Sequence, residues 1–207
     1  MCIIFQIANI KNRFMVIRLF TLILATQFFA GCSTTFKPSK VDAAGVFSTG
    51  SKISADGIKI NKPFLEKYKA LVYIATYDAD GAKFNDFLFE SFKNMGVFTE
   101  VMRKSDLEHL IIKRNLTDKI TNVHDLLALH ELERQIGPFL IVQPHVQFMG
   151  HFTFSAQLKV IDAESGETVL LLENTAFIWT GLDEPLFYPL FNGFLEWSKG
   201  EPILTEH

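Results

Sequence analysis

The sequence contains little cysteine and no acidic residue in its first 31 positions. Its only two cysteines are Cys2 and Cys32, and the first carboxylate is Asp42. Three of the 20 basic residues precede residue 32, so the remaining chain sets 17 basic against 23 acidic residues and carries a net charge of −6. This acidic balance excludes the basic surface typical of a nucleic-acid-binding protein. With 48% hydrophobic residues and 21% charged residues, the composition is that of a folded globular chain.

A long hydrophobic run is also missing. The most apolar stretch, Leu19 to Ala30, has about a dozen residues and includes Thr21, Thr26 and Gln27. A membrane-spanning helix needs about 20 apolar residues. A basic start, a short apolar run and small residues before a cysteine are instead the layout of a secretory signal peptide. We therefore predict a signal peptide over residues 1–31, whose true start is either Met1 or Met15.

The segment Phe29-Ala30-Gly31-Cys32 resembles the lipobox of bacterial lipoproteins, which usually has Leu where this chain has Phe29. The resemblance implies that the Cys32 thiol takes a diacylglyceryl group and that cleavage frees its amine for a third acyl chain. Several chains together hold a protein on a membrane, whereas one chain binds only marginally. The alternatives are an uncleaved anchor and a conventional cleavage site with an incidental cysteine. By resemblance to proteobacterial lipoproteins, Ser33 implies the outer membrane, with the domain in the periplasm.

Residues 33–56 are rich in Ser, Thr, Gly and Lys and have no sustained apolar period. They predict a flexible tether that spans about 25 to 30 Å on average. The predicted organisation is therefore a lipidated cysteine and tether over 32–56 and one globular domain over 57–207. The mature chain has no second thiol for an intramolecular disulfide.

Apolar spacing along the domain predicts its fold. In chain order, the predicted elements are a strand at 70–77, a helix at 84–95 ended by Gly96, a strand at 97–102, a helix opened by the capping-box spacing of residues 105–108, a helix at about 123–136, strands at 139–148, 152–161 and 167–179, and a helix within 185–198. This order predicts one α+β domain, in which a mixed sheet ends in an antiparallel three-strand meander and helices pack on one face.

The first hairpin of the meander has a predicted register. Apolar and polar residues alternate from Phe152 to Ile161, as in a half-buried strand. A three-residue loop at 149–151 pairs Phe148 with Phe152 and joins the apolar faces of the two strands. Gly150 then supplies the positive φ that such a loop requires.

Residues 71–179 resemble a group of small envelope proteins. Four segments carry the resemblance: Gly96-Val97-Phe98 with Val101, Ser105-Asp106-Leu107, Phe139 to Val142, and Asp162 to Glu167. The group comprises the curli-secretion lipoprotein, the penicillin-binding-protein activator lipoprotein and the amino-terminal domain of the Tol-system periplasmic protein. The resemblance implies a non-enzymatic protein that acts by assembly or by contacting envelope partners.

The sequence has no pattern typical of a metal or catalytic site. His124 and His130 are six residues apart, about 120° around a helix, whereas a metal-binding pair on a helix has a spacing of four. The segment from Thr76 would place Phe87 at the position where a calcium loop needs a bidentate carboxylate. No phosphate loop or nucleophile elbow is present. We therefore expect no metal, no cofactor and no enzyme activity, with a hydrolase using His145 or His151 as the weaker alternative.

The aromatic residues are mostly phenylalanine: 21 Phe against four Tyr and two Trp. This bias is typical of apolar packing, because binding surfaces favour the polar tips of Tyr and Trp. At the C-terminus, apolar residues point most of the way around a helix that begins near Pro189. The helix is either buried within the chain or keeps an outer side for a partner. The second case makes Phe187, Phe191, Phe194 and Trp197 a candidate interaction surface.

The sequence thus predicts a lipid-anchored envelope protein that acts as a non-enzymatic interaction or assembly component. Its predicted partners are the membrane, through acyl chains on Cys32, and an envelope protein or a second copy, with no nucleic acid. A carrier of a small ligand or lipid is the alternative, and it requires an apolar pocket lined by phenylalanines.

Overall fold

The computed structural model describes residues 36, 40–77, 80–178 and 183–206, all within one compact unit (Thr34–His207). The predicted signal peptide and Cys32 lie outside these residues. Within the described part of the chain, no helix has the length and apolarity needed to cross a membrane. The helices are α2 (Ala82–Met95), α3 (Lys104–Lys113), α4 (Leu126–Ile136) and α5 (Tyr188–Lys199), with 3-10 turns η1 (Ala55–Gly57) and η2 (Glu66–Lys69) and a π-helical turn, η4 (Asp183–Phe187).

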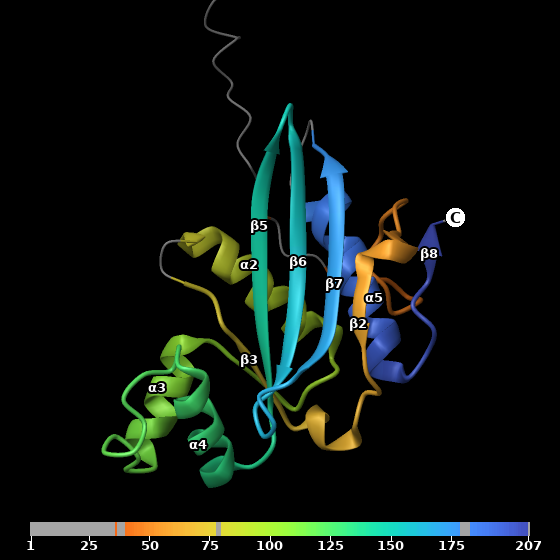
Figure 1. Cartoon of the computed structure of the whole chain (residues 1–207). Helices are drawn as coiled ribbons and strands as arrows, with labels where there is room; N and C mark the ends of the chain where they lie inside the picture. The colour runs from red at the N-terminus through yellow and green to blue at the C-terminus, as the bar shows by residue number, and fades with distance from the viewer. Residues whose placement is uncertain (1–35, 37–39, 78–79, 179–182, 207) are drawn as a thin grey trace, which may run out of the picture. The chain divides into compact units, whose positions relative to one another are not determined.

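Six strands form one mixed sheet in the order β2-β7-β6-β5-β3-β4 (Figure 1). The strands are β1 (Ile53–Ser54), β2 (Ile58–Asn61), β3 (Leu71–Ile74), β4 (Glu100–Met102), β5 (Leu140–Gly150), β6 (Thr153–Asp162), β7 (Thr168–Phe177) and β8 (Thr205–Glu206). Strand β3 pairs in parallel with β4 and β5, whereas β5, β6, β7 and β2 are antiparallel. The predicted α+β class, the mixed sheet and the β5-β6-β7 meander are confirmed.

The helices cover both faces of the sheet. Helices α2 and α5 pack on one face, where Val72 and Val142 point into the larger core. Helices α3 and α4 pack against residues of the opposite parity, including Tyr73 and Ile141. All four residues of β3 are buried, as expected of a parallel strand covered on both sides. The sequence predicted helices on one face of the sheet only. Helices α2 and α5 cover that face, and α3 and α4 cover the other.

The C-terminal helix is buried on every side that carries an aromatic residue. Phe187, Phe191 and Phe194 are 0% exposed and Trp197 is 3% exposed, so they form core and no exposed surface. The prediction that these four residues make an interaction surface is wrong, and the alternative of burial within the chain is correct. The physical reason is that a segment preceding the sheet lies on α5, where the Phe47 ring contacts the Phe191 ring at a centroid distance of 5.2 Å.

That covering segment belongs to the region predicted to be a tether. Phe47 and Ile53 are each 1% exposed, and β1 pairs in parallel with β8. The Asn192 side chain holds the backbone of Phe47 through both its amide nitrogen (2.9 Å) and its oxygen (2.7 Å). The prediction of a flexible tether over residues 33–56 is therefore wrong for Phe47 to Ile53, which are held against the domain. The apolar residues of this segment are isolated and have no period, which is why the sequence pattern did not indicate packing.

The hairpin between β5 and β6 differs from the predicted register by two residues. Phe148 pairs with Phe154, and Gly150 pairs with Thr153 across a two-residue turn, His151-Phe152. The turn residues have φ of +48° and +59°, and Gly150 has the expected positive φ, +96°. A bulge between Phe148 and Gly150 adds one residue, which restores the pairing of apolar with apolar side chains. Because the shift is two residues, each side chain stays on its predicted face.

Candidate functional site

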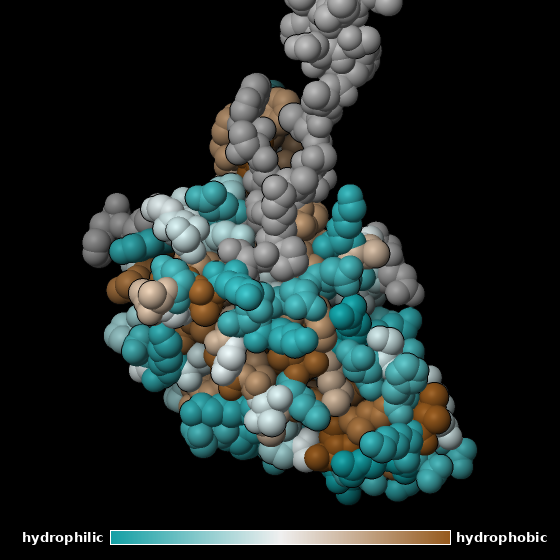
Figure 2. Space-filling model, turned by 180° about the vertical axis from the view of Figure 1, so that it is seen from behind, coloured by the Kyte–Doolittle hydropathy of each residue, from teal (hydrophilic) through white to brown (hydrophobic). Residues whose placement is uncertain are grey.

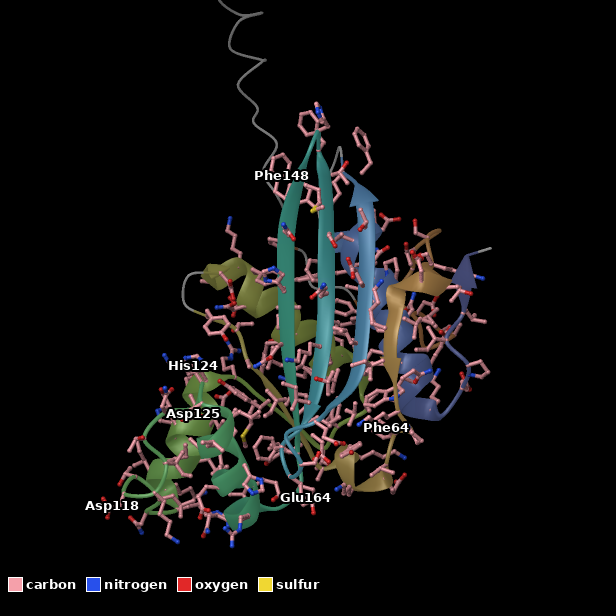
Figure 3. All side chains as sticks on the ribbon, in the orientation of Figure 1. Phe64, Asp118, His124, Asp125, Phe148 and Glu164 are labelled. Carbon is pink, nitrogen blue, oxygen red and sulfur yellow. The ribbon has the colours of Figure 1, made fainter. Side chains whose placement is uncertain are left out.

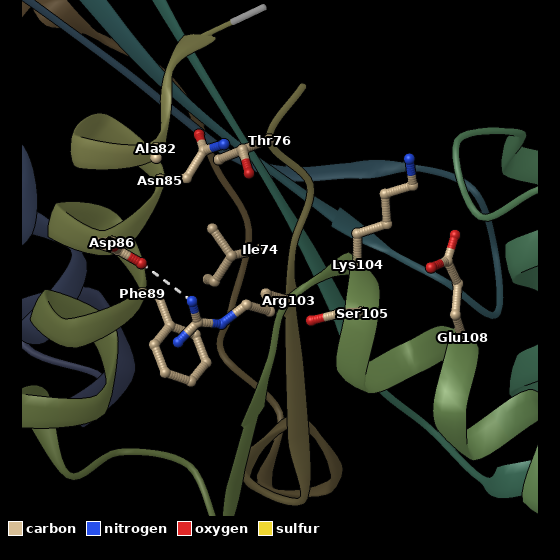
Figure 4. A pocket seen from close by; sticks show the side chains of 10 residues that line it. All are labelled: Ile74, Thr76, Ala82, Asn85, Asp86, Phe89, Arg103, Lys104, Ser105 and Glu108. Carbon is tan, nitrogen blue, oxygen red and sulfur yellow. Dashed lines mark hydrogen bonds and ion pairs between the residues drawn. The ribbon is translucent and has the colours of Figure 1, made fainter. Parts of the chain in front are cut away.

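A cleft lies at the carboxyl end of β3, between α2 and α3 (Figure 4). The chain leaves β3 into α2 on one face of the sheet and leaves β4 into α3 on the other, so the two helices diverge at this point. Open sheets with parallel strands commonly bind ligands at such a position. The cleft has a volume of about 350 Å³, and its lining is Ile74, Thr76, Ala82, Asn85, Asp86, Phe89, Arg103, Lys104, Ser105 and Glu108.

Arg103 joins the two walls of the cleft. Its Nη1 donates a hydrogen bond to Asp86 Oδ1 on α2 at 3.0 Å, and its guanidinium carbon lies 3.9 Å from the centre of the Phe89 ring. The backbone N–H of Arg103 donates to the Asp106 carboxylate at 3.0 Å, so the N-cap of α3 is Arg103, two residues before the predicted Ser105. The Asp106 carboxylate also lies 3.8 Å from Arg103 Nε, so the cation is held by two carboxylates and an aromatic face, an arrangement that fixes its orientation.

Asn85 places a hydrogen-bond acceptor in the cleft. Its Nδ2 donates to the carbonyl of Tyr77 at 3.3 Å, while its buried Oδ1 has no hydrogen-bond partner. Buried polar atoms are usually paired, so an unpaired carbonyl oxygen in a cleft is suited to receive an N–H or O–H from a bound molecule.

The cleft lining contains no histidine and no cysteine. His145 lies opposite Gln157 on the exposed side of β5, and His151 lies in the hairpin turn. His124 stacks on the Tyr77 ring at 5.3 Å, and His130 Nδ1 lies 3.2 Å from the carbonyl of Ala163. The four histidines are therefore dispersed. Over the described ranges, no group of three or more His, Cys, Asp or Glu side chains is arranged to hold a metal ion.

A second surface feature is an apolar group at the end of the β5-β6 hairpin, which we call the hairpin tip: Phe148, Met149, Phe152 and Phe177. These side chains are 62%, 58%, 55% and 63% exposed. The Phe152 and Phe177 rings contact each other edge to face at 6.4 Å, and Phe148 contacts Phe154 at 5.0 Å. Figure 2 shows brown side chains at the upper end of the molecule, and Figure 3 labels Phe148 there.

Neither feature is predicted from the sequence above. The cleft depends on residues from β3, α2 and α3 that are distant in sequence, so no local motif marks it. The hairpin tip did leave a signal. Phe148 and Met149 are adjacent apolar residues in an alternating strand, and one of two such neighbours must point away from the core.

No protein-family model and no curated protein matches this sequence. Among solved structures, the chain is similar to the LpoB C-terminal domain from Salmonella enterica, with 10% identity, 54% of this chain and 85% of that chain covered, and a TM-score of 0.35. It is also similar to lipoprotein GNA1162 from Neisseria meningitidis (13% identity, 53% and 81% covered, TM-score 0.33) and to the PelC dodecamer from Paraburkholderia phytofirmans (11% identity, 58% and 79% covered, TM-score 0.34). Likeness at this level assigns no function to this chain.

Proposed function

We propose that this chain is a lipid-anchored, non-enzymatic component of the bacterial cell envelope that binds a protein partner on the periplasmic side of the outer membrane. Acyl chains on Cys32 provide the anchor, and Ser33 directs export to the outer membrane. The observation that carries the binding role is the cleft at the carboxyl end of β3, with its fixed Arg103 cation and the unpaired acceptor of Asn85.

The chemistry of the cleft suits a segment of polypeptide. Ile74 and Phe89 supply apolar contact, Arg103 supplies a cation, and Asn85 Oδ1 accepts a hydrogen bond such as a backbone N–H donates. A peptide segment offers apolar side chains and backbone donors together, which matches this mixture.

The alternative functions have less support. A carrier requires an apolar pocket lined by phenylalanines, but the large phenylalanine cluster is packed on itself: Phe87, Phe92 and Phe191 are each 0% exposed and contact one another or neighbouring rings. A hydrolase requires a nucleophile beside a base. The hydroxyls that line the cleft, Thr76 and Ser105, have no histidine among the other lining residues.

Site-directed cross-linking tests the binding role. A photo-cross-linking residue at Ser105, which is exposed on the cleft rim, should give a discrete product with the partner in intact cells. In the same protein, Ala82→Trp places an indole in the cleft and should reduce that product at least several-fold. Lys83→Trp adds the same bulk one residue along α2, outside the lining, and should leave the product unchanged.

Equal cross-linking in the Ala82→Trp and Lys83→Trp proteins would show that the cleft does not hold the partner. If no discrete product forms from Ser105 in cells that contain the membrane-bound protein, the binding role itself is wrong.

A further inference from the structure

The β5-β6 hairpin carries exposed apolar side chains at its tip and has no Asp, Glu, Lys or Arg in its upper half. Residues 137–158 contain no Asp, Glu, Lys or Arg, and neither do residues 174–178 of the adjoining strand. The first charged side chain below the tip on β7 is Glu173, four residues from Phe177 and about 13 Å away along the strand. Exposed apolar patches normally mark a contact with another molecule or with a membrane.

The point where the chain enters the domain lies on the same half of the sheet as the hairpin tip. The Phe36 ring contacts the rings of Phe84 at 5.1 Å and Phe187 at 6.3 Å. The carbonyls of Pro185 and Leu186, next to Phe187, each accept a hydrogen bond from Asn174 Nδ2 at 2.9 Å.

The strand register shows how far along β5 the Phe36 side chain lies. Asn174 pairs with Ala156, which pairs with Val146, so Phe36 lies near the level of Val146. Gly150 is four residues further along β5, about 13 Å higher at the usual rise of a strand. The tip therefore projects about 13 Å beyond the level at which Phe36 is held.

The length of chain between Phe36 and Cys32 limits how far the domain can stand from the membrane. Cys32 is four residues before Phe36, and four residues span at most about 14 Å when fully extended. An acylated Cys32 therefore keeps Phe36 within about 14 Å of the bilayer surface, which is close to the height of the tip above Phe36. The tip is an exposed apolar feature of the described surface that reaches this distance.

We propose that the hairpin tip is a second membrane-contact site, at which Phe148, Met149, Phe152 and Phe177 insert into the interface of the bilayer that holds the acyl chains of Cys32. This inference rests on the acyl anchor of the proposed function. The composition suits insertion, because charged side chains are costly in the apolar layer whereas Phe is among the side chains that favour it. The two contacts together fix the orientation of the domain.

Dye labelling in vesicles tests the insertion. The full acylated chain is reconstituted into vesicles of phosphatidylethanolamine and phosphatidylglycerol. A cysteine introduced by Phe152→Cys carries an environment-sensitive dye, and it is the single free thiol because Cys32 is acylated and Cys2 precedes the mature chain. The matched control is Leu127→Cys on α4, where Leu127 is 77% exposed; Asp125, two residues before it, lies in the lower half of Figure 3, far below Phe148.

Lipids that carry a quencher in their acyl chains should quench the dye on Phe152→Cys several-fold more than the dye on Leu127→Cys. Equal weak quenching at both positions, in protein that floats with the vesicles, overturns the insertion and leaves the anchor intact. A dye on Phe152→Cys that is shielded from aqueous iodide yet not quenched by the lipid means that a second copy covers the tip, which also overturns it. Protein that does not float with the vesicles overturns the anchor, and the inference with it.

Discussion

Two buried tyrosines of the domain differ in how their hydroxyls are satisfied. The Tyr68 hydroxyl donates to Asp162 Oδ2 at 3.2 Å, whereas the Tyr73 hydroxyl is buried with no hydrogen-bond partner. Burial raises the pKa of Tyr73 to about 12. Burial and the nearby Asp162 carboxylate raise the pKa of Tyr68 further. The sequence predicted Tyr73 in a buried strand but gave no sign of which hydroxyl has a partner, because that depends on side chains distant in sequence.

Replacement of the two hydroxyls should therefore have opposite effects on stability. Tyr73→Phe removes an unsatisfied polar group and should raise the free energy of unfolding by about 1 kcal/mol, whereas Tyr68→Phe breaks a hydrogen bond to a carboxylate and should lower it by about 1.5 kcal/mol. Urea denaturation at pH 7 measures both. A loss of stability in both variants would contradict the assignment of Tyr73 as unsatisfied.

The raised pKa values also predict an alkaline loss of stability. A phenol whose pKa is higher in the folded state than in the unfolded state contributes stability that is complete below about pH 10 and is lost as the pH rises through the folded value. For Tyr73 that window is from about pH 10 to about pH 12. Tyr73→Phe should therefore lose less stability across this window than the parent chain does in the same denaturation series.

At the scale of the element, the β5-β6 hairpin shows how much of a strand pair the alternation of apolar and polar residues can predict. The alternation of apolar and polar residues correctly predicts which face each side chain of β5 and β6 occupies, and the positive φ of Gly150 is confirmed. The bulge before Gly150 could not be predicted. A two-residue turn with a bulge and a three-residue loop without one both place the apolar side chains of the two strands on the same face.

A side chain added at Gly150 should lower the free energy of unfolding of the domain. Gly150→Val places a β-branched residue at φ +96° and should lower the free energy of unfolding by at least about 1 kcal/mol. Gln147→Ala, an exposed position on the same strand, should change it by less than about 0.5 kcal/mol. Thermal or chemical denaturation that ranks the two variants the other way would contradict this turn geometry.

The segment that covers helix α5 could not be predicted from the residue pattern of the helix itself. The sequence predicted a helix with apolar residues on nearly all sides and left open what covers its outer side. The cover comes from Phe47, whose hydrogen bonds to Asn192 join residues 145 positions apart. A contact at that separation leaves no periodic trace in either segment, so the sequence predicts a tether for the first segment and cannot decide whether the helix aromatics are buried or exposed.

At the scale of the whole molecule, the sheet separates the two surface features. The pairing of β3 with β5 ends at Val142, and β5 continues for eight residues to Gly150, about 27 Å further along. If the tip contacts the bilayer, the cleft at the end of β3 stands away from it, where a periplasmic partner can reach it. The N-terminal pattern predicts the compartment, and the adjacent Phe148 and Met149 are a local signal for the tip, whereas the cleft emerges only from the folded chain.

The proposed function depends most on the acylation of Cys32, because the proposed anchor would set the compartment, the partners and the distance of the domain from the bilayer. Mass spectrometry of the N-terminal peptide from membrane-extracted protein measures it directly. We predict a mature chain that begins at Cys32, with a diacylglyceryl group on the sulfur and an acyl chain on the α-amine. A peptide with an unmodified Cys32 thiol, or a chain that begins at another residue, would contradict the account.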